Sequence, residues 1–292
     1  MKKTIILMAI LCLLSGCTPA EPAADIAATT LPVYEFTQRL CDGTGLQVTR
    51  LVTESVSCLH DYSLNVRQVR AVEEADLIVM NGAGLEDFMD ELLTGLDIID
   101  SSEGIDLIEC GTHHEHEHEH DHHSHSHETD SHIWLSPELA KQMASNICAG
   151  LIHRYPEHKD LFTQNLTTLL EDLDALQSYG EEQLRNLECR EIITFHDGFT
   201  YLAESFGIHI LEAVEEESGA EASAAELKEL IILVREHQLP AIFTEQNGSV
   251  SAARIISAET GVKTFSLDMA MSGDSWFEAM YRNIDTLKEA LE

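Results

Sequence analysis

The chain has 292 residues, and its 52 acidic residues against 17 lysines and arginines give a formal net charge of -35. So negative a surface repels nucleic acids and anionic lipid head groups and attracts cations, so we expect no nucleic-acid partner. A hydrophobic fraction of 44% with periodic apolar segments excludes a disordered acidic protein. The length allows two ordinary domains with a sizeable core.

The first seventeen residues predict a lipoprotein export signal. Two lysines precede an apolar run, 5–14, that is too short to span a membrane. The run ends in LSGC, which resembles the bacterial lipobox, whose cysteine (here Cys17) is lipidated. The alternative is a plain signal peptide that is cleaved elsewhere. We therefore expect a short tether at 18–24 and a mature protein held by its acyl chains at the extracytoplasmic face of the cell membrane.

From residue 25 onward the sequence predicts alternating strands and helices. In the first half, we expect a strand that ends near Pro32 and further strands at 46–52, 76–81, 97–102 and 105–110. The helices of this half are expected through Phe36 and Leu40 and at 64–75, 85–92 and 137–152. In the second half, we expect strands at 191–196, 208–214, 240–245 and 262–267, and helices at 199–206, 225–237, 250–260 and 276–291.

This alternation predicts an α/β fold with two βα lobes, mostly parallel sheets and right-handed crossovers. The N-terminal lobe is expected at 25–156, with a histidine-rich loop at 111–131, and the C-terminal lobe at 188–292. Between them, residues 157–187 contain no glycine or proline before Gly180, which predicts one long helix that acts as a stiff connector. Sheets of this kind bind ligands at the carboxyl ends of their strands.

A histidine-rich tract between residues 111 and 132 predicts metal binding. Imidazole with carboxylate suits zinc, copper, nickel or cobalt better than calcium or magnesium. A solvated charge run and an expression tag are the alternatives, but the tract is internal, irregular and interleaved with acids. Whether it is the functional site or an accessory to one stays open. Its nine histidines are His113, His114, His116, His118, His120, His122, His123, His125 and His127.

A second candidate site lies where predicted strands end. Three histidines and one aspartate fall at or just beyond such ends, or at the start of the helix after the tract: His60, His132, His196 and Asp268. Three imidazoles and one carboxylate form the tetrahedral set that zinc prefers. The alternative is that these residues are polar only for solvation. Asp61 and Asp197 directly follow two of the histidines and are candidates for orienting their rings.

Four segments together resemble the zinc-binding lipoproteins of bacterial ABC importers, the ZnuA-like family: SCLHDYSL (57–64), DSHIWLSP (130–137), ITFHDGFTYLAESFGI (193–208) and FSLDMAMSGDSWFEAMYRNIDTL (265–287). The resemblance runs from about Asp25 to the C-terminus, and the histidine-rich insert precedes the second histidine as it does in zinc members. It implies two α/β lobes joined by one long helix. It also implies Zn²⁺ ligation by His60, His132 and His196, with Asp268 at the fourth position.

Some positions bear on the choice of metal. Manganese-type relatives carry Glu where this chain has His196, and a third imidazole favours zinc over manganese. The fourth position varies in the family and is water in some members, which leaves Asp268 open. Cys58 and Leu59 replace the commoner residues before the first histidine, and Ser131 replaces a proline. The Cys58 thiol could itself bind zinc. The alternative is that this cysteine is packed in the fold or forms a disulfide bridge.

The resemblance implies an extracytoplasmic protein that captures Zn²⁺ and delivers it to an ABC permease powered by a separate ATPase. The chain has no phosphate-binding loop for ATP and no further apolar run long enough to span a membrane. Other chains must therefore supply the ATPase and the permease. We expect a monomer without enzymatic activity and a tract that collects zinc beside the cleft. The alternatives are manganese or another divalent ion on the same fold, a zinc hydrolase, for which HExxH is missing, and a surface zinc buffer or adhesin.

Overall fold

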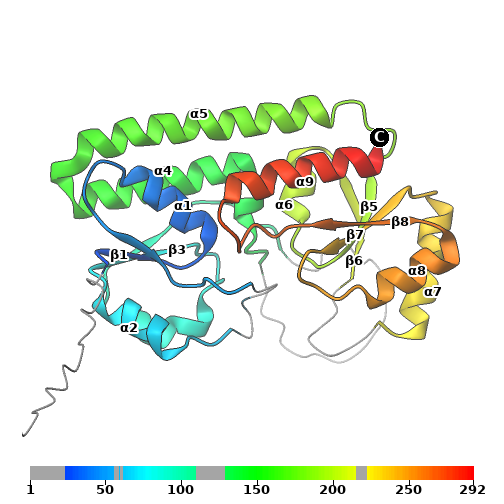
Figure 1. Cartoon of the computed structure of the whole chain (residues 1–292), viewed down its shortest axis with the longest axis horizontal. Helices are drawn as coiled ribbons and strands as arrows, with labels where there is room; N and C mark the ends of the chain where they lie inside the picture. Colours follow the sequence, from blue (N-terminus) through cyan, green and yellow to red (C-terminus); the bar gives the residue numbers. More distant parts are fainter. Residues whose placement is uncertain (1–23, 56–58, 60–61, 110–128, 215–221) are drawn as a thin grey trace, which may run out of the picture.

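The computed structural model describes residues 24–55, 59, 62–109, 129–214 and 222–292. Figure 1 shows two α/β lobes side by side, with one long helix running along both, as the sequence predicted. The predicted export signal with Cys17 and nearly all of the histidine-rich loop lie outside the described residues. In the described part of the chain, no helix has the length and apolar character needed to cross a bilayer.

The N-terminal lobe contains, among the described residues, a four-stranded parallel sheet of order β2-β1-β3-β4. Its strands are β1 (Ile26–Ala28), β2 (Val48–Arg50), β3 (Leu77–Met80) and β4 (Ile98–Asp100). Its helices are α1 (Leu31–Leu40), α2 (Val66–Glu74), α3 (Asp90–Leu93) and α4 (Pro137–Arg154). The central strands β1 and β3 are almost fully buried, which explains their continuous apolar sequences.

The C-terminal lobe repeats this design with the described strands in the order β6-β5-β7-β8, again all parallel. The strands are β5 (Glu191–Phe195), β6 (His209–Ala213), β7 (Ala241–Glu245) and β8 (Lys263–Leu267). The helices are α6 (Thr200–Ser205), α7 (Ala224–Glu236), α8 (Ser251–Thr260) and α9 (Trp276–Leu291).

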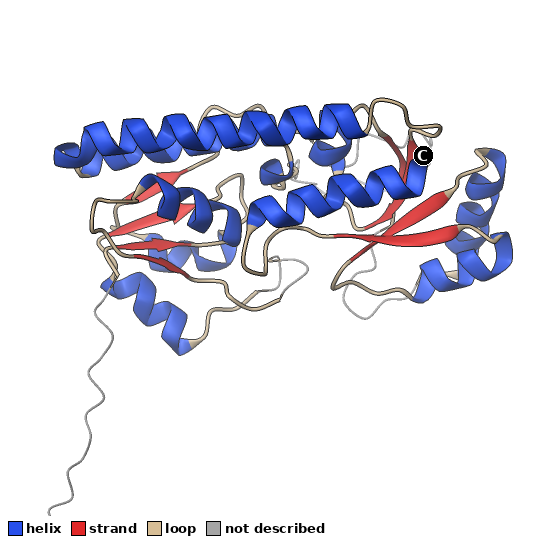
Figure 2. Cartoon of the chain, turned by 45° about the horizontal axis from the view of Figure 1, so that its top comes forward, coloured by secondary structure: helices blue, strands red, loops and turns tan. Residues whose placement is uncertain are grey.

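The connector α5 (Lys159–Gln183) packs along α4 in one lobe and α9 in the other, as Figures 1 and 2 show. At Gly180, α5 passes close to the ring of Phe206. A Cβ atom at this position would lie only 2.2 Å from that ring. The helix therefore lies directly against the C-terminal lobe at this point, where only a glycine leaves room for the ring.

Helix α9 also connects the lobes, although it belongs to the C-terminal one. The carboxylate of Glu35 in α1 accepts hydrogen bonds from the Trp276 N–H at 2.5 Å and the Ser275 hydroxyl at 3.1 Å. Next to this contact, the Trp276 ring packs edge to face on Phe36 with centroids 5.0 Å apart. A carboxylate at the first turn of a helix is stabilised by the unpaired N–H groups there, so this contact holds the start of α9 against the other lobe.

Three elements differ from their predictions. The first strand ends at Ala28, and Pro32 lies in the first turn of α1, where a proline costs no hydrogen bond because the N–H groups of that turn have no partner within the helix. The predicted strand at 105–110 is absent among the described residues, where only an isolated antiparallel bridge joins Glu109 to Thr129. The connector is shorter at both ends than 157–187, and a 3-10 turn, Pro156–His158, precedes it.

Candidate metal centre

The predicted ligand His132 lies at the edge of the N-terminal lobe. It is buried, and a 3-10 turn, Ile133–Leu135, leads from it into α4. Asp130 Oδ1 accepts a hydrogen bond from the His132 backbone N–H at 2.9 Å and lies 2.7 Å from ring atom Nδ1. Because a carboxylate accepts and does not donate, Nδ1 carries the proton, and Nε2 is the nitrogen that can bind a metal.

His196 follows β5 directly and brings a second imidazole from the C-terminal lobe. The centroids of the His132 and His196 rings lie 5.4 Å apart, edge to face. The backbone of Gly198 passes close to both, since a Cβ atom there would stand 2.8 Å from the ring of His196 and 3.0 Å from that of His132. Two of the predicted ligands therefore meet where the lobes join, and glycine is what allows the approach.

Glu245, the last residue of β7, lies in the same place and was not predicted from the sequence. Its side chain is 3% exposed, and Oε2 lies 3.8 Å from Nδ1 of His196. Burial raises the pKa of Glu245 to about 7; the charge of His132 opposes this rise, and the Asp268 carboxylate adds to it. The available signal was its position at the carboxyl end of a strand next to the one that precedes His196.

Asp268 follows β8 and is largely buried. Its Oδ1 accepts the Ala270 N–H at 2.8 Å, and its Oδ2 accepts a hydrogen bond from Arg282 Nη2 at 3.0 Å. Asn283 holds the backbone, because its amide donates to the Asp268 carbonyl at 2.7 Å and accepts the Asp268 N–H at 2.8 Å. Residues of α9 thus fix both the backbone and the carboxylate of this predicted ligand.

Among the described residues, no three His, Cys, Asp or Glu side chains are already grouped as a metal site. The predicted first ligand, His60, lies outside the described residues, as do Asp61 and Cys58. The nearest described residues on either side are in contact, because the Tyr62 N–H donates to the carbonyl of the buried Leu59 at 3.0 Å. The ligand roles, including that of Asp268, therefore stay predictions.

The two ends of the histidine-rich loop are joined next to His132. The Asp130 N–H donates to the Ile108 carbonyl at 2.8 Å, beside the bridge from Glu109 to Thr129. The hydroxyl of Tyr201, in α6 of the other lobe, accepts the Ile108 N–H and donates to the Asp130 carbonyl, each at 3.0 Å. One buried side chain therefore binds both stems of the loop, two residues from a predicted ligand.

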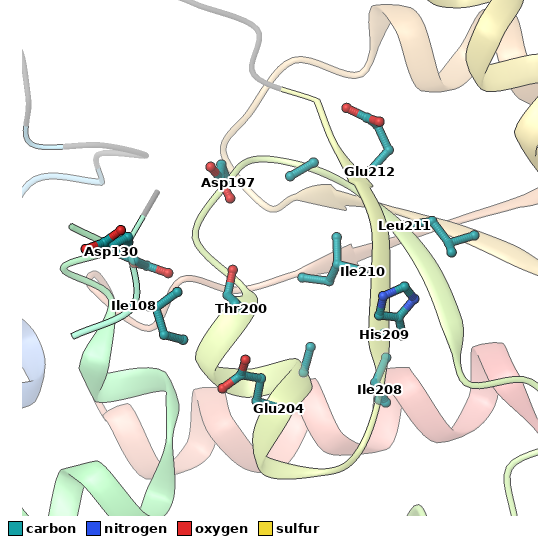
Figure 3. A pocket seen from close by; sticks show the side chains of 13 residues that line it. Ile108, Asp130, Asp197, Thr200, Glu204, Ile208, His209, Ile210, Leu211 and Glu212 are labelled. Atoms are coloured by element: carbon teal, nitrogen blue, oxygen red, sulfur yellow. The ribbon is translucent and has the colours of Figure 1, made fainter. Parts of the chain in front are cut away.

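A pocket of about 200 Å³ lies between these stems and the α6 and β6 elements (Figure 3). The ionisable side chains that line it are five acids, Glu109, Asp130, Asp197, Glu204 and Glu212, and one histidine, His209. Asp197 lines this pocket as well. Its proposed role, to orient the ring of His196, stays a prediction. The acidic wall attracts cations towards the stems of the histidine-rich loop.

Two parallel α/β lobes are thus joined by one long helix, and imidazoles and carboxylates from both lobes gather where the lobes meet. A family model described as "Zinc-uptake complex component A periplasmic" matches residues 26–290, and the chain belongs to this ZnuA family.

Relatives of this family are similar over most of the chain. "Zinc-binding lipoprotein AdcA" of Streptococcus pneumoniae serotype 4 is 31% identical over 100% of this chain, which spans only 62% of that relative. "High-affinity zinc uptake system protein ZnuA" of Bacillus subtilis is 30% identical over 91% of this chain and 87% of its own length. The crystal structure of the Zn(II)-bound ZnuA-like domain of Streptococcus pneumoniae AdcA has a TM-score of 0.76 and 28% identity, and covers 92% of this chain and 98% of that domain.

Proposed function

We propose that the protein captures Zn²⁺ outside the cytoplasm, in a site formed by His60, His132, His196 and Asp268, and delivers it to an ABC permease. The observation that carries the proposal is the meeting of His132 and His196, one from each lobe, with 5.4 Å between ring centroids. An ion bound by both rings would link the two lobes. The zinc names of the relatives and the Zn(II)-bound neighbour support the choice of metal.

The chemistry of the ligands also supports zinc. Neutral imidazole nitrogens and one carboxylate suit Zn²⁺, whereas Mn²⁺ prefers more carboxylate oxygen. Because the imidazoles must be deprotonated to bind, zinc affinity should fall as the pH drops through the histidine titration range. Manganese capture by the same residues is the second candidate. What favours it is the buried carboxylate of Glu245, 3.8 Å from the His196 ring, with the Asp268 carboxylate close enough to raise the pKa of Glu245.

The histidine-rich tract acts in this proposal as an accessory that collects zinc beside the cleft. Nine weak ligands tethered next to His132 raise the local zinc concentration without forming the tight site. The permease and its ATPase are separate chains, and the protein reaches them from a lipid anchor at Cys17. A Cys17→Ala variant should move from the membrane fraction to the soluble fraction and keep its zinc affinity.

A competition titration tests the proposal. The wild-type protein and a variant lacking residues 113–127 are titrated with zinc and with manganese against a chelator of known affinity. We expect one tight zinc site in both, which is lost in His60→Ala and in His196→Ala. His237→Ala is the matched control, because His237 pairs with Glu191 at the other end of β5, 2.9 Å away. If deletion of residues 113–127 alone abolished tight zinc binding, the protein would be a surface zinc buffer instead.

A further inference from the structure

Both oxygens of the Asp268 carboxylate accept hydrogen bonds from the protein itself. One oxygen accepts the Ala270 N–H, and the other accepts the guanidinium of Arg282 at 3.0 Å. The Asp268 side chain is 12% exposed, whereas that of Arg282 is 58% exposed. The guanidinium of Arg282 therefore approaches the Asp268 carboxylate from the solvent side, and it can move away towards solvent.

Arg282 also has a second carboxylate within reach. Glu278, one turn earlier on α9, places Oε2 4.0 Å from Arg282 Nη1. Such i, i+4 pairs on a helix surface are weak, so Glu278 offsets only a small part of the interaction that Arg282 loses when it leaves Asp268. Arg282 thus has one partner inside the site, Asp268, and one outside it, Glu278.

Two cations cannot share Asp268 without loss, because a guanidinium and a divalent ion at the same carboxylate repel each other and compete for its lone pairs. We propose that Arg282 is a specificity-determining residue, which competes with the incoming ion for the Asp268 carboxylate and so disfavours ions that depend on oxygen ligands. Zn²⁺, which imidazoles satisfy, is affected least, and Mn²⁺, which prefers carboxylate, is affected most. The inference rests on the proposed ligand role of Asp268.

The test compares zinc and manganese affinities of the full chain by competition titration. In Arg282→Gln we expect manganese to bind about tenfold more tightly and zinc about threefold more tightly, as removal of one charged partner allows. Arg282→Lys, which keeps the charge but loses the planar fork, should lie between Arg282→Gln and wild type. Arg154→Gln is the matched control, since Arg154 pairs with Asp97 at 3.3 Å, beside the amino end of β4 and away from the site.

A double variant separates competition at Asp268 from the general repulsion between Arg282 and any cation. In an Asp268→Asn background, Arg282→Gln should change neither affinity if the arginine acts through Asp268. Equal tightening in both backgrounds, or weaker metal binding in Arg282→Gln, would overturn the inference. If Asp268→Asn alone leaves both affinities unchanged, the ligand role of Asp268 fails first. If it weakens binding but Arg282→Gln does not tighten it, only the inference on Arg282 fails.

Discussion

Asp130 holds the ring of His132 through a 2.7 Å contact between Oδ1 and Nδ1, while the same oxygen accepts the backbone N–H of His132. A carboxylate in this position fixes the tautomer of the imidazole and raises the basicity of its other nitrogen. The aspartate was not recognised from the sequence, although it stands only two residues before the histidine.

Removal of this carboxylate should weaken zinc binding without unfolding the protein. For Asp130→Ala we expect a loss of zinc affinity of about 10- to 100-fold, the usual range for partners of metal-binding histidines. A competition titration measures it. Asp174→Ala is the matched control, because Asp174 is an exposed carboxylate on α5 that pairs with Lys141 at 2.8 Å. An unchanged affinity in Asp130→Ala would argue against His132 as a ligand.

Gly198 should be intolerant of any side chain. A Cβ atom there would lie 2.8 Å from both the His196 ring and the Met269 side chain, so Gly198→Ala should displace the rings and lower zinc affinity about tenfold or more. Gly150→Ala is the comparison, because its Cβ would stand 2.5 Å from Ile99, away from the site. That variant should lose stability in urea denaturation but keep its zinc affinity, and the reverse pattern would contradict the site.

The buried carboxyl group of Glu86 should make the stability of the protein depend on pH. This fully buried carboxyl group accepts hydrogen bonds from the Thr29 hydroxyl and from the Asn81 and Gly82 N–H groups, at 2.6 to 3.0 Å. Burial nevertheless raises its pKa to about 7, with those hydrogen bonds opposing the rise and Asp100 adding to it. The folded state then binds more protons than the unfolded state between pH 4.5 and 7. The contribution of Glu86 to stability is therefore present at pH 4.5 and is lost as the pH rises towards 7.

The amide of Glu86→Gln does not titrate, which makes this variant the test. Urea denaturation from pH 4.5 to 8 should show a flatter dependence in Glu86→Gln than in wild type, with a difference of about 2–3 kcal/mol across the range. Parallel curves for the two proteins would show that Glu86 is not the titrating group.

The contact of Glu35 with the start of α9 predicts a stability effect between the lobes. Glu35→Ala removes the acceptor of the Trp276 N–H, and we expect a loss of about 1 kcal/mol, as for other helix caps. Urea denaturation measures the loss. Glu289→Ala removes an exposed carboxylate from the same helix and should have no effect. Equal stability of all three proteins would show that this contact does not hold the lobes together.

Much of the fold followed from the sequence because buried parallel strands carry continuous apolar runs and the connector lacks helix-breaking residues. The rule that ligands gather at strand ends placed His196 and Asp268 correctly at the ends of β5 and β8. The same rule applied to Glu245, whose carboxylate was overlooked because it closes the apolar strand PAIFTE. The Arg282 contact with Asp268 depends on how α9 packs back on β8, and no local pattern in the sequence reports that packing.

The two hydrogen bonds of Tyr201 determine how well the chain tolerates a change in the length of the histidine-rich loop. Since one hydroxyl and a short antiparallel pairing hold both stems of the histidine-rich loop together, the number of residues between the stems can vary with little strain on His132. Loop closure cost grows only slowly with length, by about 0.6 kcal/mol per doubling. The stems at Glu109 and Thr129 therefore mark an insertion point, where a reporter domain or a shorter polar linker could replace the native tract while the neighbouring histidine keeps its place.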